Sequence, residues 1–98
     1  MNISAKRDKN TLVIGISGRV DTVSAPELEK SITENIDGVN ELILDLKDMT
    51  YTSSAGLRVF LKAQKLMNQQ GTLTLKNVCN EVMEIFEVTG FSEILNIE

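Results

Sequence analysis

Two adjacent serines, Ser53 and Ser54, are the residues of this chain best placed to do chemistry. They follow a strand-like apolar run, Glu41–Leu46, and precede a long helical pattern, so they fall where a strand leads into a helix. A serine at a helix start can accept a hydrogen bond from an unpaired backbone N–H of the first turn. The same position tolerates a phosphate, because free N–H groups and the positive end of the helix dipole face it. From the residues alone a plain cap is the favoured interpretation, and a phosphorylation switch is the alternative.

Hydrolytic chemistry at these serines would lack a general base. The chain contains no histidine and a single cysteine, Cys79, which has no second thiol or histidine with which to share a metal. We expect Cys79 to be a small buried residue in a helical segment. The remaining catalytic alternative, with Ser54 as nucleophile and Asp21 as helper, still has no base to accept the proton. The sequence therefore predicts a protein that is not an enzyme and that needs no metal or cofactor.

Composition and charge narrow the class of partner. The 98 residues are 42% hydrophobic, which predicts one domain over residues 1–98 with its own core. A net charge of −4, from 10 basic and 14 acidic residues, argues against nucleic acid and anionic membranes as partners. No apolar run approaches the roughly 20 residues of a membrane span, and Met1–Arg7 does not resemble a secretory signal. We expect a cytoplasmic protein, monomeric when free, that binds a protein or a small molecule.

The first part of the chain predicts a hairpin followed by a helix. Ile3–Lys6 has the pattern of a short edge strand and Thr11–Gly18 that of a stronger one, with turn-forming residues between them. A helix is predicted over Ala25–Asn35, opened by a capping box in which Ser24 and Glu27 satisfy each other's backbone N–H groups.

The second part alternates strands with helices. Glu41–Leu46 is apolar enough to predict an interior strand covered on both faces, followed by a loop over Lys47–Thr50. A helix is predicted over Ala55–Gln70, a strand over Thr72–Lys76, and a second helical stripe that ends at Gly90. The tail from residue 91 fits a strand or a helix equally well. This order predicts an α/β fold: a single mixed, mostly parallel sheet of four to five strands with interleaved helices. In such a sheet the loops of Asp21 and of the serines lie at one end.

The helix after the serines carries more apolar residues than one stripe needs. Its core-facing stripe is formed by Gly56, Val59, Phe60, Ala63 and Met67. Leu57 and Leu61 lie roughly 100–140° from the centre of that stripe, so they either widen the buried face or form a ridge for a partner. We adopt the second as a hypothesis, in which Leu57→Ala weakens binding by about 1–3 kcal/mol at little cost in stability. Gly56 costs up to about 1 kcal/mol relative to alanine in a helix, which indicates close packing or close approach to its backbone.

Three segments of the chain together resemble the STAS domain of bacterial anti-sigma factor antagonists. They are Gly18–Asp21 ahead of a helix, Leu44–Leu46 as the central strand, and Tyr51–Arg58 at the start of the next helix, and the similarity extends over essentially the whole chain. The resemblance implies a binding switch without catalytic activity. The unmodified antagonist binds an anti-sigma factor that is also a serine kinase, which releases the sigma factor. The kinase phosphorylates a loop serine and so ejects its binder, and a PP2C-type phosphatase reverses the modification.

The resemblance also implies site residues. The family motif is often Asp-Ser-Ser-Gly-Leu or Asp-Ser-Thr-Gly-Leu, and its first hydroxyl residue is the one modified. Aligning Gly56 and Leu57 with the Gly-Leu pair places the modified serine at Ser54, which is then expected both to cap the helix and to act as the switch. Ser53 stands where the family has an aspartate and is a second, less favoured candidate. From the residues alone Asp21 is either a solvated turn former or a residue that faces the serine loop, and the resemblance matches it to an acidic residue of the neighbouring loop. The expected partner-binding residues are Asp21, Ser53, Ser54, Gly56, Leu57 and Leu61.

A second role stays open within the same resemblance. STAS domains also occur as transporter tails, stressosome components and small subunits of lipid-transport complexes, which do not use the same phosphorylation cycle. In this chain Ala55 replaces the usual second hydroxyl residue, and the resulting Ser-Ala-Gly-Leu form permits such a non-switching interaction subunit. Phosphate transfer from a cognate kinase distinguishes the two roles.

Overall fold

The computed structural model describes residues 1–98 and contains one sheet and three α-helices. The strands are β1 (Asn2–Asp8), β2 (Thr11–Val20), β3 (Glu41–Thr52) and β4 (Thr72–Lys76). The helices are α1 (Ala25–Asn35), α2 (Ser54–Asn68), α3 (Asn80–Thr89) and the short 3-10 helix η1 (Phe91–Glu93).

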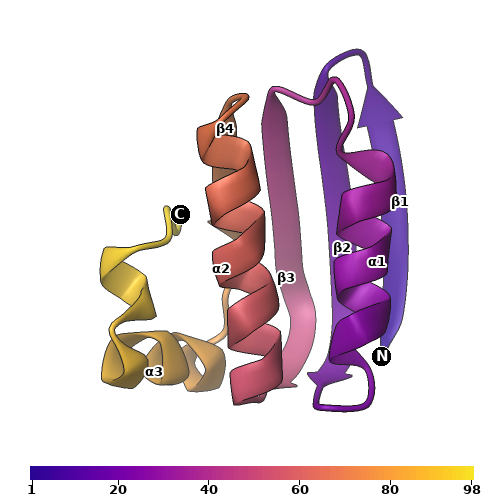
Figure 1. Ribbon diagram of the computed structural model, residues 1–98. Helices are drawn as coiled ribbons and strands as arrows, with labels where there is room; N and C mark the ends of the chain where they lie inside the picture. The colour runs from indigo at the N-terminus through magenta and orange to yellow at the C-terminus, as the bar shows by residue number, and fades with distance from the viewer.

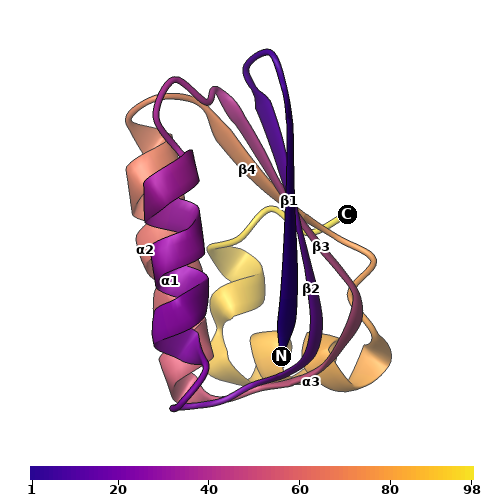
Figure 2. The same cartoon turned by 90° about the vertical axis from the view of Figure 1, so that its right-hand side faces the viewer.

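The strands form a single four-stranded sheet in the order β1-β2-β3-β4. β1 and β2 are the predicted antiparallel hairpin, whereas β2–β3 and β3–β4 are parallel, so the predicted mixed, mostly parallel α/β sheet is confirmed. Helices α1 and α2 cover one face of the sheet, and α3 lies near the carboxyl ends of the parallel strands (Figures 1 and 2). The carboxyl ends of β2 and β3 therefore lead into α1 and α2 at the same end of the molecule.

The core lies between the sheet and the two helices. Alternate residues of β2 and β3 point into it, among them Leu12, Ile14, Leu42 and Leu44, and each is at most 1% exposed. The predicted stripe on α2 packs against them. The ring of Phe60 on α2 meets that of Phe86 on α3 edge to face, with centroids 5.9 Å apart. Helix α2 is thus held against both the sheet and α3.

Strand β3 is longer than predicted. The loop expected over residues 47–50 is wrong, because the strand continues to Thr52 through two register shifts opposite β2. The extra residue at each bulge is left unpaired and bends the strand, and pairing with β2 resumes beyond it. Met49 and Thr52, in this continued part of β3, are 1% and 2% exposed. Coverage on both faces is also wrong, since Ile43 and Asp45 on the outer face are only half-buried.

The ends of the helices agree with prediction more closely than their caps do. Helix α1 has the predicted bounds and α3 ends at Gly90, whose φ of 82° is the left-handed conformation that glycine favours. The capping box is wrong: Ser24 is itself in a helical conformation, and its hydroxyl bonds to Asp21 instead of the first turn.

The C-terminal tail lies along β4, the edge strand of the sheet. It forms η1 and then pairs Ile97 with Leu75 in a parallel bridge, so the tail has both helical and extended parts.

Cys79 is half-buried at the N-cap of α3, not within a helix as expected. None of the helices has the length and apolar character that crossing a bilayer requires.

Candidate functional site

The two loops singled out by sequence lie side by side at the carboxyl end of the sheet. The backbone N–H of Ser53 donates to the carbonyl oxygen of Val20 at 2.8 Å, directly before the β2–α1 loop. Arg19 and Val20 pair with Tyr51 and Thr52 in the β2–β3 ladder. The expected neighbourhood of the Asp21 loop and the serine loop is confirmed. We call this region, formed by residues 21–24 and 53–58, the loop end.

We expected Ser54 both to cap α2 and to be the modified residue, but in the structure Ser53 is the cap. Ser53 is the N-cap of α2, in an extended conformation, and its hydroxyl accepts from the backbone N–H of Gly56 at 3.4 Å. Ser54 is the first helical residue; its side chain is exposed and makes no hydrogen bond. The expectation that Ser54 caps the helix is therefore wrong. Because Ser53 takes that role, the hydroxyl of Ser54 is left free toward solvent.

Gly56 is required by packing. It is buried, and a Cβ built on it would lie 2.9 Å from the Cγ1 of Val20 and would overlap the hydroxyl of Thr52. The close packing predicted at this glycine is confirmed. Because Gly56 has no side chain, the first turn of α2 packs directly on Val20 and Thr52 at the ends of β2 and β3. This contact positions the serines relative to the sheet.

Leu57 belongs to the core. It is 6% exposed and is part of the buried cluster, so the hypothesis that it lies mainly on a partner surface is wrong. The reason is that α2 lies between α1 and α3 (Figure 1), and its buried face extends along its flanks as well as toward the sheet. Leu61, one turn later, is half-buried. Of the two leucines, only Leu61 offers substantial surface.

Asp21 organises its own loop. Its Oδ1 accepts from the backbone N–H of Ser24 at 2.9 Å, from the Ser24 hydroxyl at 3.0 Å and from the N–H of Val23 at 3.0 Å. These bonds, those from Ser24 first, hold the pKa of the carboxyl below its usual value, because they favour the charged form. None of them reaches the serine loop. The carboxylate stabilises a tight turn, and no group of the loop end is placed as a base for Ser54.

Val23 is an exposed apolar residue of the loop end that the sequence pattern did not single out. Its side chain is 89% exposed, although its own N–H is held by Asp21. Exposed apolar surface is suited to binding a partner. Because hydrogen bonds already hold this loop, binding costs little further conformational entropy. The signal in the sequence was an isolated valine within a polar loop. At the carboxyl ends of β2 and β3, the guanidinium of Arg19 lies 4.2 Å from the centroid of the Tyr51 ring.

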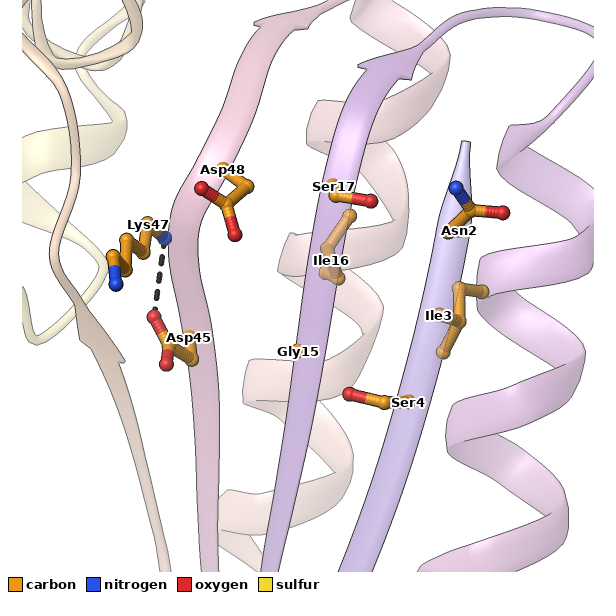
Figure 3. A pocket seen from close by; sticks show the side chains of 9 residues that line it. All are labelled: Asn2, Ile3, Ser4, Gly15, Ile16, Ser17, Asp45, Lys47 and Asp48. Atoms are coloured by element: carbon orange, nitrogen blue, oxygen red, sulfur yellow. Dashed lines mark hydrogen bonds between the residues drawn. The ribbon is translucent and has the colours of Figure 1, made fainter.

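A separate hollow of about 290 Å³ lies on the face of the sheet that α1 and α2 leave open (Figure 3). Its wall includes Ser4, Ser17, Asp45 and Asp48, with Gly15 between them. Asp45 accepts from the side-chain amide of Asn77 and from the N–H of Lys47, both at 3.1 Å, and these bonds lower the pKa of its carboxyl. Neither serine bonds to a carboxylate, and no cluster of three or more potential metal ligands is present anywhere in the chain. The hollow is polar but contains no nucleophile with a base.

Comparison with known proteins gives consistent results for sequence and fold. A family model described as the STAS domain matches residues 2–98. The anti-sigma-B factor antagonist of Bacillus subtilis (strain 168) is 32% identical over 98 residues, which cover 99% of this chain and 90% of that protein. An anti-sigma factor antagonist from Mycobacterium paratuberculosis has a similar structure, with a TM-score of 0.89 at 20% identity, covering 98% of this chain and 83% of that one. The phosphorylated form of the Bacillus cell fate determinant SpoIIAA matches with a TM-score of 0.77 at 17% identity, over 99% of this chain and 91% of that one.

Proposed function

This chain belongs to the STAS domain family, and on that basis we propose that it is an anti-sigma factor antagonist controlled by phosphorylation of Ser54. The unmodified protein binds an anti-sigma factor that is also a serine kinase, and the sigma factor is released. The observation that carries this proposal is the exposed, unbonded hydroxyl of Ser54 in the first turn of α2. It is supported by the anti-sigma-B factor antagonist that is 32% identical over nearly the whole chain.

Phosphorylation at Ser54 is compatible with the fold. Ser54 Oγ would form a bond to the γ-phosphorus of ATP as ADP leaves, and the hydroxyl proton is lost to the kinase. The phosphate adds a charge of about −1.5 to −2 at a helix N-terminus, where the dipole and free backbone N–H groups favour it. No acidic residue lies in the first turn of α2 to repel it. The phosphate therefore acts on the partner interface and leaves the monomer intact.

Ser53 is the weaker candidate for modification. It is half-buried, and its hydroxyl already accepts a hydrogen bond from the backbone of Gly56. A phosphate on Ser53 would replace the hydroxyl that caps α2, whereas a phosphate on Ser54 leaves that cap in place. A neighbour of the same fold, SpoIIAA, has a structure in the phosphorylated form, which supports phosphorylation of this chain. We propose that a PP2C-type phosphatase removes the phosphate from Ser54.

The partner surface that we propose is the exposed part of the loop end together with Leu61. Asp21 contributes by holding the β2–α1 loop, and Val23 and Ser54 contribute exposed side chains. Ser53, Gly56 and Leu57 act from beneath, as the cap and the packing that position the first turn of α2.

Incubation with its anti-sigma factor kinase and ATP tests the function. We expect one phosphate per chain, located at residue 54 by mass spectrometry, and none in Ser54→Ala. Ser53→Ala should still be modified, although loss of the cap costs about 1 kcal/mol in stability. Modification that persists in Ser54→Ala and disappears in Ser53→Ala would move the site to Ser53. Tight binding with no phosphate transfer would favour the non-switching interaction subunit.

Val23 provides a test of the binding surface that is independent of phosphorylation. We expect Val23→Ser to weaken kinase binding about five- to thirtyfold, corresponding to about 1–2 kcal/mol, because an exposed apolar anchor is lost. Thermal stability should stay unchanged, since the side chain is 89% exposed. Val88 on α3 is the matched control: it is 86% exposed and lies outside the loop end, so Val88→Ser should bind like the parent. Equal affinities of the two variants would remove Val23 from the surface.

A further inference from the structure

Arg58 is an exposed cation without a partner, four residues after Ser54. The three ion pairs of the protein involve other residues, and the Arg58 guanidinium takes part in no hydrogen bond. Lys62, one turn further along α2, is engaged by Glu29 of α1 at 3.3 Å. Arg58 is thus the free cation nearest in sequence to the proposed phosphorylation site.

The helix places Arg58 beside Ser54. Residues four apart in an α-helix lie on one face, with Cβ atoms roughly 5–6 Å apart. Side chains in a helix lean toward its N-terminus, so Arg58 extends back over the turn that Ser54 begins. A guanidinium has a planar set of donors that matches two phosphate oxygens at once. The spacing therefore suits a bidentate pair across one turn.

The other charged groups in and next to the loop end, Asp21 and Arg19, already have partners. The carboxylate of Asp21 accepts three bonds within its own loop, and the guanidinium of Arg19 lies over the Tyr51 ring. The first turn of α2 contains no acidic residue that would attract Arg58 away. A phosphate on Ser54 would therefore meet one free arginine and no competing carboxylate on the same turn.

We propose that Arg58 is the internal partner of the phosphate on Ser54 and pairs with it in the modified protein. This inference rests on the proposed function and extends it. In the unmodified protein Arg58 stays free at the edge of the partner surface; in the modified protein the phosphate binds it. Phosphorylation then changes two side chains of that surface, since it adds an anion at Ser54 and withdraws a cation at Arg58.

The test measures the phosphate directly by ³¹P NMR. Phosphoserine is incorporated at position 54 during translation, so no kinase is needed, and the second pKa of the phosphate is titrated in the parent and in Arg58→Gln. A neighbouring guanidinium favours the dianion, so we expect the pKa to be higher in Arg58→Gln than in the parent by about 0.15–0.4 pH units. Arg58→Lys keeps the charge without the planar fork and should lie between the two.

Lys62→Gln is the matched control, because it removes a cation from α2 two turns from Ser54. An unchanged phosphate pKa in Arg58→Gln would overturn the inference, and so would an equal shift in Lys62→Gln, which would indicate only a general loss of positive charge. Circular dichroism of each variant confirms that the helix is intact. Because the phosphate is built in, failure of this test leaves the kinase assay unaffected, and failure of the kinase assay leaves this pairing testable.

Discussion

Ser54→Asp should bind the anti-sigma factor kinase on the order of a hundredfold or more weakly than Ser54→Ala. In a closed interface the carboxylate must lose its water or meet a pocket shaped for a hydroxyl, and burying an unpaired charge costs several kcal/mol. Each 1.4 kcal/mol is a factor of ten in affinity. Ser54→Ala removes only an exposed hydroxyl that makes no hydrogen bond in the free protein, so it should bind like the parent.

Calorimetric titration of the parent and both variants against the kinase measures this difference. The melting temperatures serve as the control: an acidic residue in the first turn of a helix is stabilising by a few tenths of a kcal/mol, so Ser54→Asp should melt at or slightly above the parent. A low affinity combined with unchanged stability identifies a blocked interface. Equal affinities of the Asp and Ala variants would refute the blocking mechanism.

Leu57→Ala should destabilise the protein by about 2–5 kcal/mol, as expected for a leucine removed from a core. Leu57 is 6% exposed and belongs to the cluster that joins the sheet to α1, α2 and α3. For a domain of this size each kcal/mol lowers the melting temperature by roughly 4–8 °C, so a decrease of at least about 8 °C is expected. Thermal unfolding followed by circular dichroism measures it.

Leu61→Ala is the matched control for Leu57→Ala. Leu61 has the same side chain on the next turn of α2 but is half-buried, so it should lose clearly less stability. If Leu61 contacts the kinase, its variant should lose affinity under conditions where both proteins are folded. A Leu57→Ala protein that melts like the parent would show that burial at this position contributes little to stability.

The sequence alone predicted most of the fold because the main signals are local. Pro26 in the first turn indicates where α1 begins. The alternation of polar and apolar residues gives the bounds of β4, and Gly90 marks the end of α3. Strand and helix order then determined a mixed, mostly parallel sheet with both loops at one end. The position of the two serines also predicted a junction between a strand and a helix, which the structure has where β3 leads into α2.

What the sequence could not decide depended on contacts between distant segments. Leu57 and Leu61 have the same type and lie on the same side of the helix, yet one is buried and the other is half-exposed. Helical periodicity predicts the direction in which a side chain points, but not which other elements pack against that side of the helix. Here α3 as well as the sheet contacts α2, through Phe86 and Phe60. The continuation of β3 through residues 47–50 likewise depended on pairing with β2.

The division between the two serines also required the tertiary structure. Both can cap a helix, so type and spacing left the choice open. Packing of Gly56 against Val20 and Thr52, and the bond from the Ser53 N–H to the Val20 carbonyl, set the residue at which the helix begins. With α2 beginning at Ser54, the hydroxyl of Ser53 is used by the backbone and that of Ser54 is free, because the N-cap residue just before the first turn is the one whose hydroxyl accepts from its backbone N–H groups.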